Sequence, residues 1–241
     1  MTELTADVGN VCAEQRIDEW GVARNPGWPC TPSLPYVIAL VGRHSPHALG
    51  SIGRDHHMSQ AFFDDYARLF GELDAAAAAL VRLARDAGFR AIQNSNVMAG
   101  PHDDPPLPDW GDAGVFPHKT AATQAGLGWI GKTALFVSSR FGPGVRLTSV
   151  FTDMPLTPGR PITESRCGRC TSCVASCPQG AGIDVLWQAG MTRDELYDEK
   201  ACEAKTYEHP EWDGTCGVCQ SVCPITRHAM RQLPWRTGRA A

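Results

Sequence analysis

The chain has 241 residues and a formal net charge of −4, with 22 Lys and Arg against 26 Asp and Glu. This charge does not favour a nucleic-acid surface, and the apolar stretches are too short to cross a membrane. The N-terminus has neither a basic start nor an apolar run, so no secretory signal is expected. We expect a cytoplasmic protein, in which ten cysteines are metal ligands more readily than disulfides.

The first half of the chain predicts alternating strands and helices. Residues 35–42 (PYVIALVG) form an apolar run bounded by proline and glycine, which predicts a buried strand. Residues 58–89 carry apolar side chains at helical spacing and predict a long helix, with Gly88 as its end cap. Gly71 marks a kink or a break in that helix, and residues 89–95 (FRAIQNS) predict the next strand.

The middle of the chain continues this pattern after a loop. Residues 98–114 are rich in Pro, Gly and Asp and predict that loop. Residues 118–126 (HKTAATQAG) predict a short helix that closes at its final glycine. Residues 133–139 (TALFVSS) and 145–156 (VRLTSVFTDMPL) predict two strands, joined by the glycine-rich turn RFGPG.

Two cysteine runs dominate the C-terminal third. Residues 167–178 (CGRCTSCVASCP) follow C-x2-C-x2-C-x3-C-P, the pattern of two-cluster ferredoxins, in which the fourth cysteine ligates the other cluster. Residues 216–224 (CGVCQSVCP) lack the leading cysteine, and Asp213 stands in its place. Cys202, between the runs, is the nearby candidate to replace it.

We therefore predict two [4Fe–4S] clusters. Zinc would favour two separated cysteine pairs, and disulfides do not suit the expected compartment. Cys12 and Cys30 lie far from the runs and are expected to be small buried apolar residues. The predicted ligands of the first cluster are Cys167, Cys170, Cys173 and Cys223, and those of the second are Cys177, Cys202, Cys216 and Cys219.

These patterns predict an α/β (α+β) core with an appended ferredoxin-like double [4Fe–4S] cluster module. We place the core, which would bind cofactor and substrate, at residues 1–160 and the cluster module at 161–227. Residues 228–241 are expected to be a tail, and the basic stretch that follows Pro224 is expected to be loosely held.

Residues 125–132 (AGLGWIGK) carry a further motif. A dinucleotide-binding interpretation is disfavoured, because a helix is predicted before the motif and a strand after it. Together with residues 149–156 (SVFTDMPL) and the cysteine runs, the motif resembles the epoxyqueuosine reductase family. Residues 53–57 (GRDHH) resemble that family less closely. The resemblance covers roughly residues 35–226.

This resemblance implies a cobalamin that is bound with its lower base displaced, receives electrons from the clusters and reduces the substrate, as in reductive dehalogenases. It also implies a proton-donating aspartate, whose position relative to the tryptophan of the glycine motif corresponds to Asp112. A lone cysteine between the two runs is a cluster ligand in that family, which supports Cys202 as a ligand here. Asp112 could instead cap the helix near His118, Gly126 and Gly128 could form a helix cap and a tight turn, and Trp129 could fill the core. The candidate cofactor-binding residues are Gly126, Leu127, Gly128, Trp129, Ile130, Gly131 and Lys132.

The family's tRNA-acting members continue past the clusters into a helical-repeat domain. This chain ends 17 residues after Pro224, so we expect a short form without that domain. With the negative net charge this puts tRNA in doubt, and a small-molecule or protein-bound substrate is expected. An external donor of the ferredoxin or flavodoxin type would supply electrons. The alternatives are an iron–sulfur electron-transfer protein, which could hold a flavin, or a reductase that activates the corrinoid of another protein.

Overall fold

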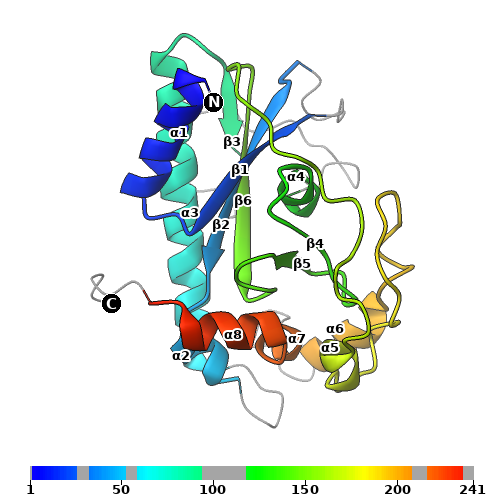
Figure 1. Ribbon diagram of the computed structural model, residues 1–241. Helices are drawn as coiled ribbons and strands as arrows, with labels where there is room; N and C mark the ends of the chain where they lie inside the picture. The colour runs from blue at the N-terminus through cyan, green and yellow to red at the C-terminus, as the bar shows by residue number, and fades with distance from the viewer. Residues whose placement is uncertain (1, 26–32, 53–58, 94–117, 208–215, 236–241) are drawn as a thin grey trace. The chain divides into compact units, whose positions relative to one another are not determined.

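The computed structural model describes residues 2–25, 33–52, 59–93, 118–207 and 216–235 (Figure 1). The chain forms two compact units, each assembled from separate stretches of sequence. Unit 1 comprises Met1–Gly42, Leu69–Leu127 and Arg146–Ile162, and unit 2 comprises Arg43–Arg68, Gly128–Val145 and Thr163–Ala241. The domain boundaries expected at residues 160 and 227 stay predictions.

Unit 1 is built on a four-stranded sheet in the order β1-β2-β6-β3. β1 pairs antiparallel with β2, with Glu19 opposite Val41, and β3 pairs antiparallel with β6, with Ala91 opposite Thr152. β2 confirms the first predicted strand, whereas β1 was not predicted. The strands are β1 Glu19–Arg24, β2 Tyr36–Arg43, β3 Ala91–Gln93 and β6 Val145–Thr152.

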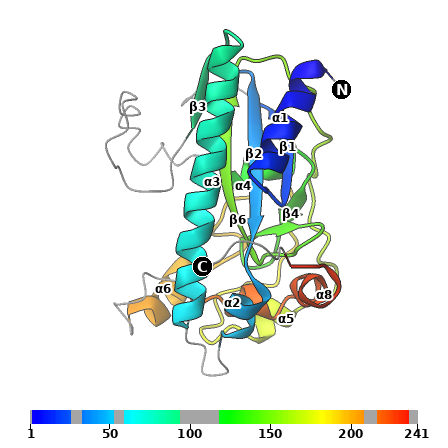
Figure 2. The ribbon, with the colours of Figure 1, turned by 90° about the vertical axis from the view of Figure 1, so that its left-hand side faces the viewer.

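Three helices pack on this sheet. α1 (Glu3–Glu14) and α3 (Gln60–Asp86) lie on one face and α4 (His118–Gln124) lies on the other, as two perpendicular views show (Figures 1 and 2). The core on the first face joins apolar side chains of both helices to alternate positions of the strands, among them Val8, Cys12, Leu73, Leu80, Ile38, Leu40 and Val150. α3 confirms the long predicted helix, and it runs unbroken through Gly71.

Two glycines end helices of unit 1 as the sequence predicts. Gly88 has a φ of +81°, and the N–H of Phe89 reaches back to the carbonyl oxygen of Ala84 at 2.8 Å. Gly126 also has a φ of +81°, and the N–H of Leu127 bonds to the carbonyl oxygen of Ala122 at 3.1 Å. Glycine adopts this left-handed conformation without steric cost, so both positions are helix caps.

Unit 2 contains a small antiparallel sheet and short helices. β4 (Gly128–Ile130) pairs with β5 (Phe136–Ser138), so the strand predicted at residues 133–139 is shorter than expected and belongs to a different sheet from β6. The helices that lie wholly in this unit are α2 Pro46–Gly50, α5 Ser172–Ala175, α6 Glu199–Tyr207, α7 Val218–Ser221 and α8 Pro224–Gln232. Across the described stretches of both units, no helix is long and apolar enough to cross a bilayer.

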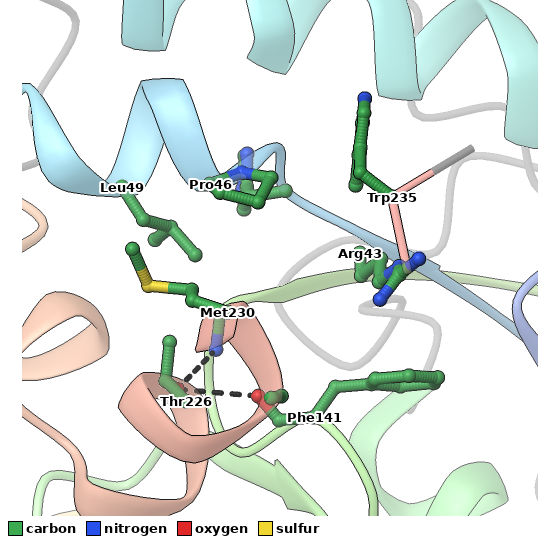
Figure 3. Close-up of a pocket in the computed structure, with 10 residues that line it drawn as sticks. Arg43, Pro46, Leu49, Phe141, Thr226, Met230 and Trp235 are labelled. Atoms are coloured by element: carbon green, nitrogen blue, oxygen red, sulfur yellow. Dashed lines mark hydrogen bonds between the residues drawn. The ribbon is translucent and has the colours of Figure 1, made fainter. Parts of the chain in front are cut away.

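The prediction that the chain after Pro224 is loosely held is wrong as far as Gln232, because these residues form α8. Pro224 occupies the first turn, where a missing N–H costs nothing and the fixed φ suits a helix. Thr226, which is 1% exposed, attaches this helix to the loop after β5 (Figure 3). Its hydroxyl donates to the carbonyl oxygen of Phe141 at 3.2 Å and accepts the N–H of Gly144 at 3.3 Å.

The pocket beside this attachment is small. It measures about 10 Å³ and is lined by residues that include Arg43, Leu49, Met230 and Trp235 (Figure 3). A volume of about 10 Å³ holds at most a single water molecule. The guanidinium carbon of Arg43 lies 5.0 Å from the ring centre of Trp235, which adds a cation–π contact at the pocket wall. The pocket is therefore too small to bind a substrate.

Candidate functional site

The two cysteine runs adopt the same local structure in unit 2. Each has one four-residue helix, α5 in the first run and α7 in the second, and these helices carry Cys173 and Cys219. Each helix is followed by a one-residue cap and then by the Cys-Pro pair that ends the run. α5 and α7 contact each other. The sequence echo is thus a structural repeat, with its two copies side by side.

Four thiols interact in a first group. Burial raises the pKa of Cys173, and the charges of Cys167 and Cys223 raise it further. Burial also raises the pKa of Cys223, with further increases from Cys167 and Cys170. These mutual effects arise only between groups that lie near one another. They link the four cysteines that the sequence assigns to the first cluster.

The other four thiols interact in a second group. Burial raises the pKa of Cys219 far above its ordinary value, and the charges of Cys216 and Cys202 add to the effect. Burial raises the pKa of Cys202, and Cys177 raises it further. Cys173 of the first group also acts on Cys219, so the two groups adjoin.

The chemistry of this donor set fits two iron–sulfur clusters. Half-buried thiols with raised pKa values hold their protons until a cation compensates the thiolate charge, as a metal centre does. Within the ranges that the structure describes, no three His, Cys, Asp or Glu side chains are placed to hold one metal ion. A [4Fe–4S] cluster uses a different geometry, in which each of four cysteines binds its own iron.

Polar groups point at several of the sulfurs. The indole Nε1–H of Trp129 donates to Cys167 Sγ at 3.3 Å, and the N–H of Ala181 donates to Cys177 Sγ at 3.4 Å. Two hydroxyl-bearing side chains also act on the second group, since Thr133 lowers the pKa of Cys219 and Tyr197 lowers that of Cys202. Hydrogen bonds of this kind tune the potential of an iron–sulfur cluster.

Lys132 lies in the same region. Its ammonium Nζ is 2.6 Å from Asp184 Oδ1, and its side chain is 5% exposed. Hydrogen bonds from Ser172 lower the pKa of Cys170, and the positive charge of Lys132 lowers it further. Lys132 thus balances a carboxylate and favours the thiolate form of a predicted cluster ligand.

The glycines of the AGLGWIGK motif are explained by contacts within each unit. Gly126, Gly128 and Gly131 have G-x-G-x-x-G spacing, but the motif follows α4 and enters β4, the reverse of the dinucleotide-binding order. A Cβ on Gly126 would lie 2.4 Å from the carbonyl oxygen of Arg160, and one on Gly128 would lie 2.0 Å from that of Val137. The chain's own backbone occupies this space, so contact of these glycines with a corrinoid stays a prediction.

The other residues of the motif divide between the two units. Leu127 belongs to unit 1, and Trp129 and Ile130 are buried in unit 2. Trp129 fills the core, which is one of the two roles considered for it, and it also bonds to a predicted cluster ligand, which the sequence did not indicate.

The predicted proton donor, Asp112, lies outside the described residues, as do His56 and His57. His118 is described in unit 1, where its Nδ1 is 3.0 Å from Ser149 Oγ. Burial, followed by the charge of Arg146, lowers the pKa of His118 to about 4. His118 is therefore neutral near pH 7.

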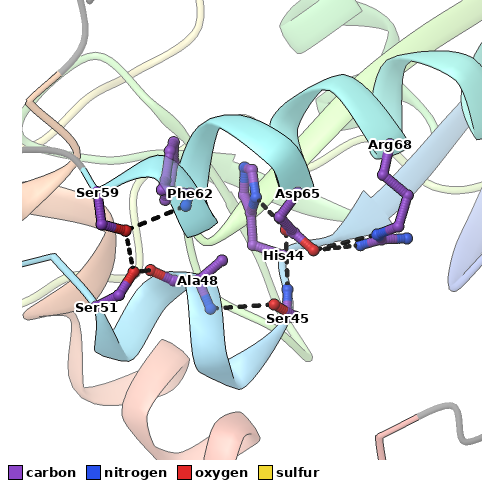
Figure 4. A network of polar contacts seen from close by, with 8 residues as sticks. All are labelled: His44, Ser45, Ala48, Ser51, Ser59, Phe62, Asp65 and Arg68. Atoms are coloured by element: carbon purple, nitrogen blue, oxygen red, sulfur yellow. Dashed lines mark hydrogen bonds and ion pairs between the residues drawn. The ribbon is translucent and has the colours of Figure 1, made fainter. Parts of the chain in front are cut away.

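A polar network in unit 2 was missed by the sequence analysis (Figure 4). His44 Nδ1 lies 2.8 Å from Asp65 Oδ2, and Arg68 Nη2 donates to Asp65 Oδ1 at 2.7 Å. Burial alone would raise the pKa of Asp65, but these hydrogen bonds hold it below its ordinary value. Phe62 stacks on His44 and also lies near Gly217, so the network supports the second cysteine run.

The fold has known counterparts. A reductive dehalogenase structure described with a mechanism for B12-dependent dehalogenation superposes with a TM-score of 0.68 and 17% identity, over 92% of this chain and 32% of that one. An epoxyqueuosine reductase bound to a tRNA stem loop superposes with a TM-score of 0.58 and 18% identity, over 93% of this chain and 66% of that one. Both comparisons place the chain in a mixed helix-and-sheet class, as the predicted α/β core requires.

Sequence comparisons identify the relatives. Tetrachloroethene reductive dehalogenase of Sulfurospirillum multivorans is 36% identical over 126 residues, which are 47% of this chain and 24% of that protein. Epoxyqueuosine reductase of Bacillus cereus is 33% identical over 125 residues, 47% of this chain and 30% of that protein. No family model matches. The chain thus spans less than a third of these relatives' length. Over that part, the resemblance to the epoxyqueuosine reductase family is confirmed. Both relatives are oxidoreductases.

Proposed function

We propose that the protein is a cobalamin-dependent iron–sulfur reductase. Cys167, Cys170, Cys173 and Cys223 hold one [4Fe–4S] cluster, and the second group of four cysteines holds another. Electrons from a ferredoxin- or flavodoxin-type donor pass through these clusters to a corrinoid whose lower base is displaced. The reduced substrate is a small molecule or a protein-bound group.

The division of eight thiols into two adjoining groups of four carries this proposal. Each group draws one cysteine from the other run, Cys223 for the first group and Cys177 for the second, as a two-cluster ferredoxin pattern requires. The second group also takes Cys202 from between the runs. The adjoining pair Cys173 and Cys219 gives electrons a short path between the clusters. The reductase names of both curated relatives agree with this redox role.

The chain's own residues prepare the sulfurs for this chemistry. Lys132 favours the Cys170 thiolate, and the partial burial of Cys219 shields one ligand of the second cluster from water. A bound corrinoid supplies low-valent cobalt that can reduce carbon centres. Its place in the proposal rests on the relatives, because the space at Gly126 and Gly128 is already filled.

The test begins with anaerobic reconstitution of the full chain with iron and sulfide. We expect about eight irons per chain, because each of two clusters contains four. The Cys202→Ser variant should lose one cluster and keep the other, whereas Cys12→Ser, outside both groups, should keep both. Titration with hydroxocobalamin and reduction should then give the visible spectrum of base-off Co(II).

A second candidate is an iron–sulfur electron-transfer protein. The observation that favours it is the packing of the glycine motif, which needs no corrinoid to explain it. An eight-iron protein that leaves the cobalamin spectrum unchanged would support this candidate. A protein that binds no iron would refute both.

A further inference from the structure

The five residues from Trp129 to Thr133 lie against thiols of both groups. Trp129 donates its indole N–H to Cys167 Sγ at 3.3 Å, and a Cβ on Gly131 would lie 3.8 Å from the same sulfur. The Thr133 side chain lies near Cys219, whose pKa it lowers. All of these residues belong to unit 2. One short segment therefore gives a hydrogen-bond donor to each of the two thiol groups.

The Trp129 donor is held firmly. Trp129 is the central residue of β4, opposite Val137 of β5, and it is 4% exposed. A buried indole N–H without an acceptor costs free energy, so its orientation follows its partner. Here that partner is a cysteine sulfur rather than a carbonyl oxygen.

The Thr133 donor is equally enclosed. Thr133 is 8% exposed, and its methyl group lies beside Gly182, where an added Cβ would be 3.2 Å away. Its sulfur partner, Cys219, is half-buried within the second group. Because Trp129 is 4% exposed, water cannot readily replace its hydrogen bond to Cys167.

We propose that this segment sets the reduction potentials of the two clusters separately, Trp129 through Cys167 and Thr133 through Cys219. The inference rests on the proposed ligation of the clusters by these cysteines. Reduction adds one electron to a cluster, and the charge spreads onto its sulfurs. An N–H or O–H dipole that points at a sulfur stabilises the reduced state more than the oxidised state, and so raises the potential.

The test is a redox titration of the reconstituted full chain, followed by electron paramagnetic resonance. Trp129→Phe and Thr133→Val each remove one donor and keep an apolar side chain of similar shape. At a fixed potential we expect the ratio of reduced to oxidised cluster to fall about tenfold, which is about 59 mV for a one-electron couple. Each variant should lower the reduction potential of one cluster and leave that of the other cluster unchanged.

Two control variants separate this role from packing. Thr133→Ser keeps the hydroxyl and should keep the wild-type potentials. Trp20→Phe changes a tryptophan of unit 1 and should shift neither cluster. If Trp129→Phe loses its cluster, β-(3-benzothienyl)alanine at position 129 keeps the ring shape without the N–H and decides the question.

The possible results are distinct. Unchanged potentials in both variants, or an equal shift of both clusters in each, would overturn the inference and leave the proposed clusters standing. Failure of the wild-type chain to assemble clusters would instead refute the proposed function.

Discussion

Replacement of Thr226 by valine keeps the shape of the side chain and removes its hydroxyl. This leaves the carbonyl oxygen of Phe141 and the N–H of Gly144 buried without their partner. Each unsatisfied buried group costs about 1–3 kcal/mol, so with two such groups the free energy of unfolding should fall by about 2–6 kcal/mol. Thr226→Ser keeps the hydroxyl and loses one methyl group, which costs about 1 kcal/mol.

The assay is urea unfolding of the reconstituted protein, followed by circular dichroism. The backbone N–H of residue 226 that lies at the Cys223 sulfur is unchanged in both variants, so each should assemble the same clusters as the wild type. A Thr226→Val variant as stable as Thr226→Ser would show that these two hydrogen bonds do not hold α8 in place.

Three further experiments test other parts of the structure. Gly128→Ala should destabilise the protein and lower its iron content, since the new Cβ would lie 2.0 Å from the Val137 carbonyl oxygen, whereas Gly50→Ala adds a Cβ with nothing within 4 Å and should do neither. Asp65→Asn should lower the free energy of unfolding at pH 7. Because the folded pKa of Asp65 is below its unfolded value, the stabilisation by its carboxylate is present above the unfolded pKa of about 3.9 and is lost as the pH falls through the folded pKa. The unfolding curves of the variant and the wild type should therefore converge in acid. Burial raises the pKa of Cys12 to about 12, so a maleimide at pH 8 should label this residue only after unfolding, and rapid labelling of the native protein would contradict its place in the core.

Features with a local cause could be predicted from the sequence. Gly88 and Gly126 end helices because each follows a helical pattern, and glycine alone adopts the left-handed conformation freely. The long helix was visible in its apolar spacing. Cys12 was expected in the core and is 1% exposed there.

Features that depend on distant partners could not be predicted. His44 and Asp65 are 21 residues apart, and no spacing rule links them before the fold brings them together. Trp129 is a large aromatic residue of the kind that commonly fills a core. Only the pairing of β4 with β5 reveals that its N–H meets a sulfur 38 residues away. The stretch after Pro224 was expected to be loosely held, although a proline in the first turn also starts helices.

The position of Trp129 and Thr133 on one continuous segment constrains how this protein can change. The two donors are separated by three residues, and each meets a different sulfur. An insertion or deletion between them would move at least one donor away from its partner, while the cysteine spacing stayed intact. Homologues that keep all eight cysteines are therefore expected to keep the length of this segment as well, even where its individual side chains differ.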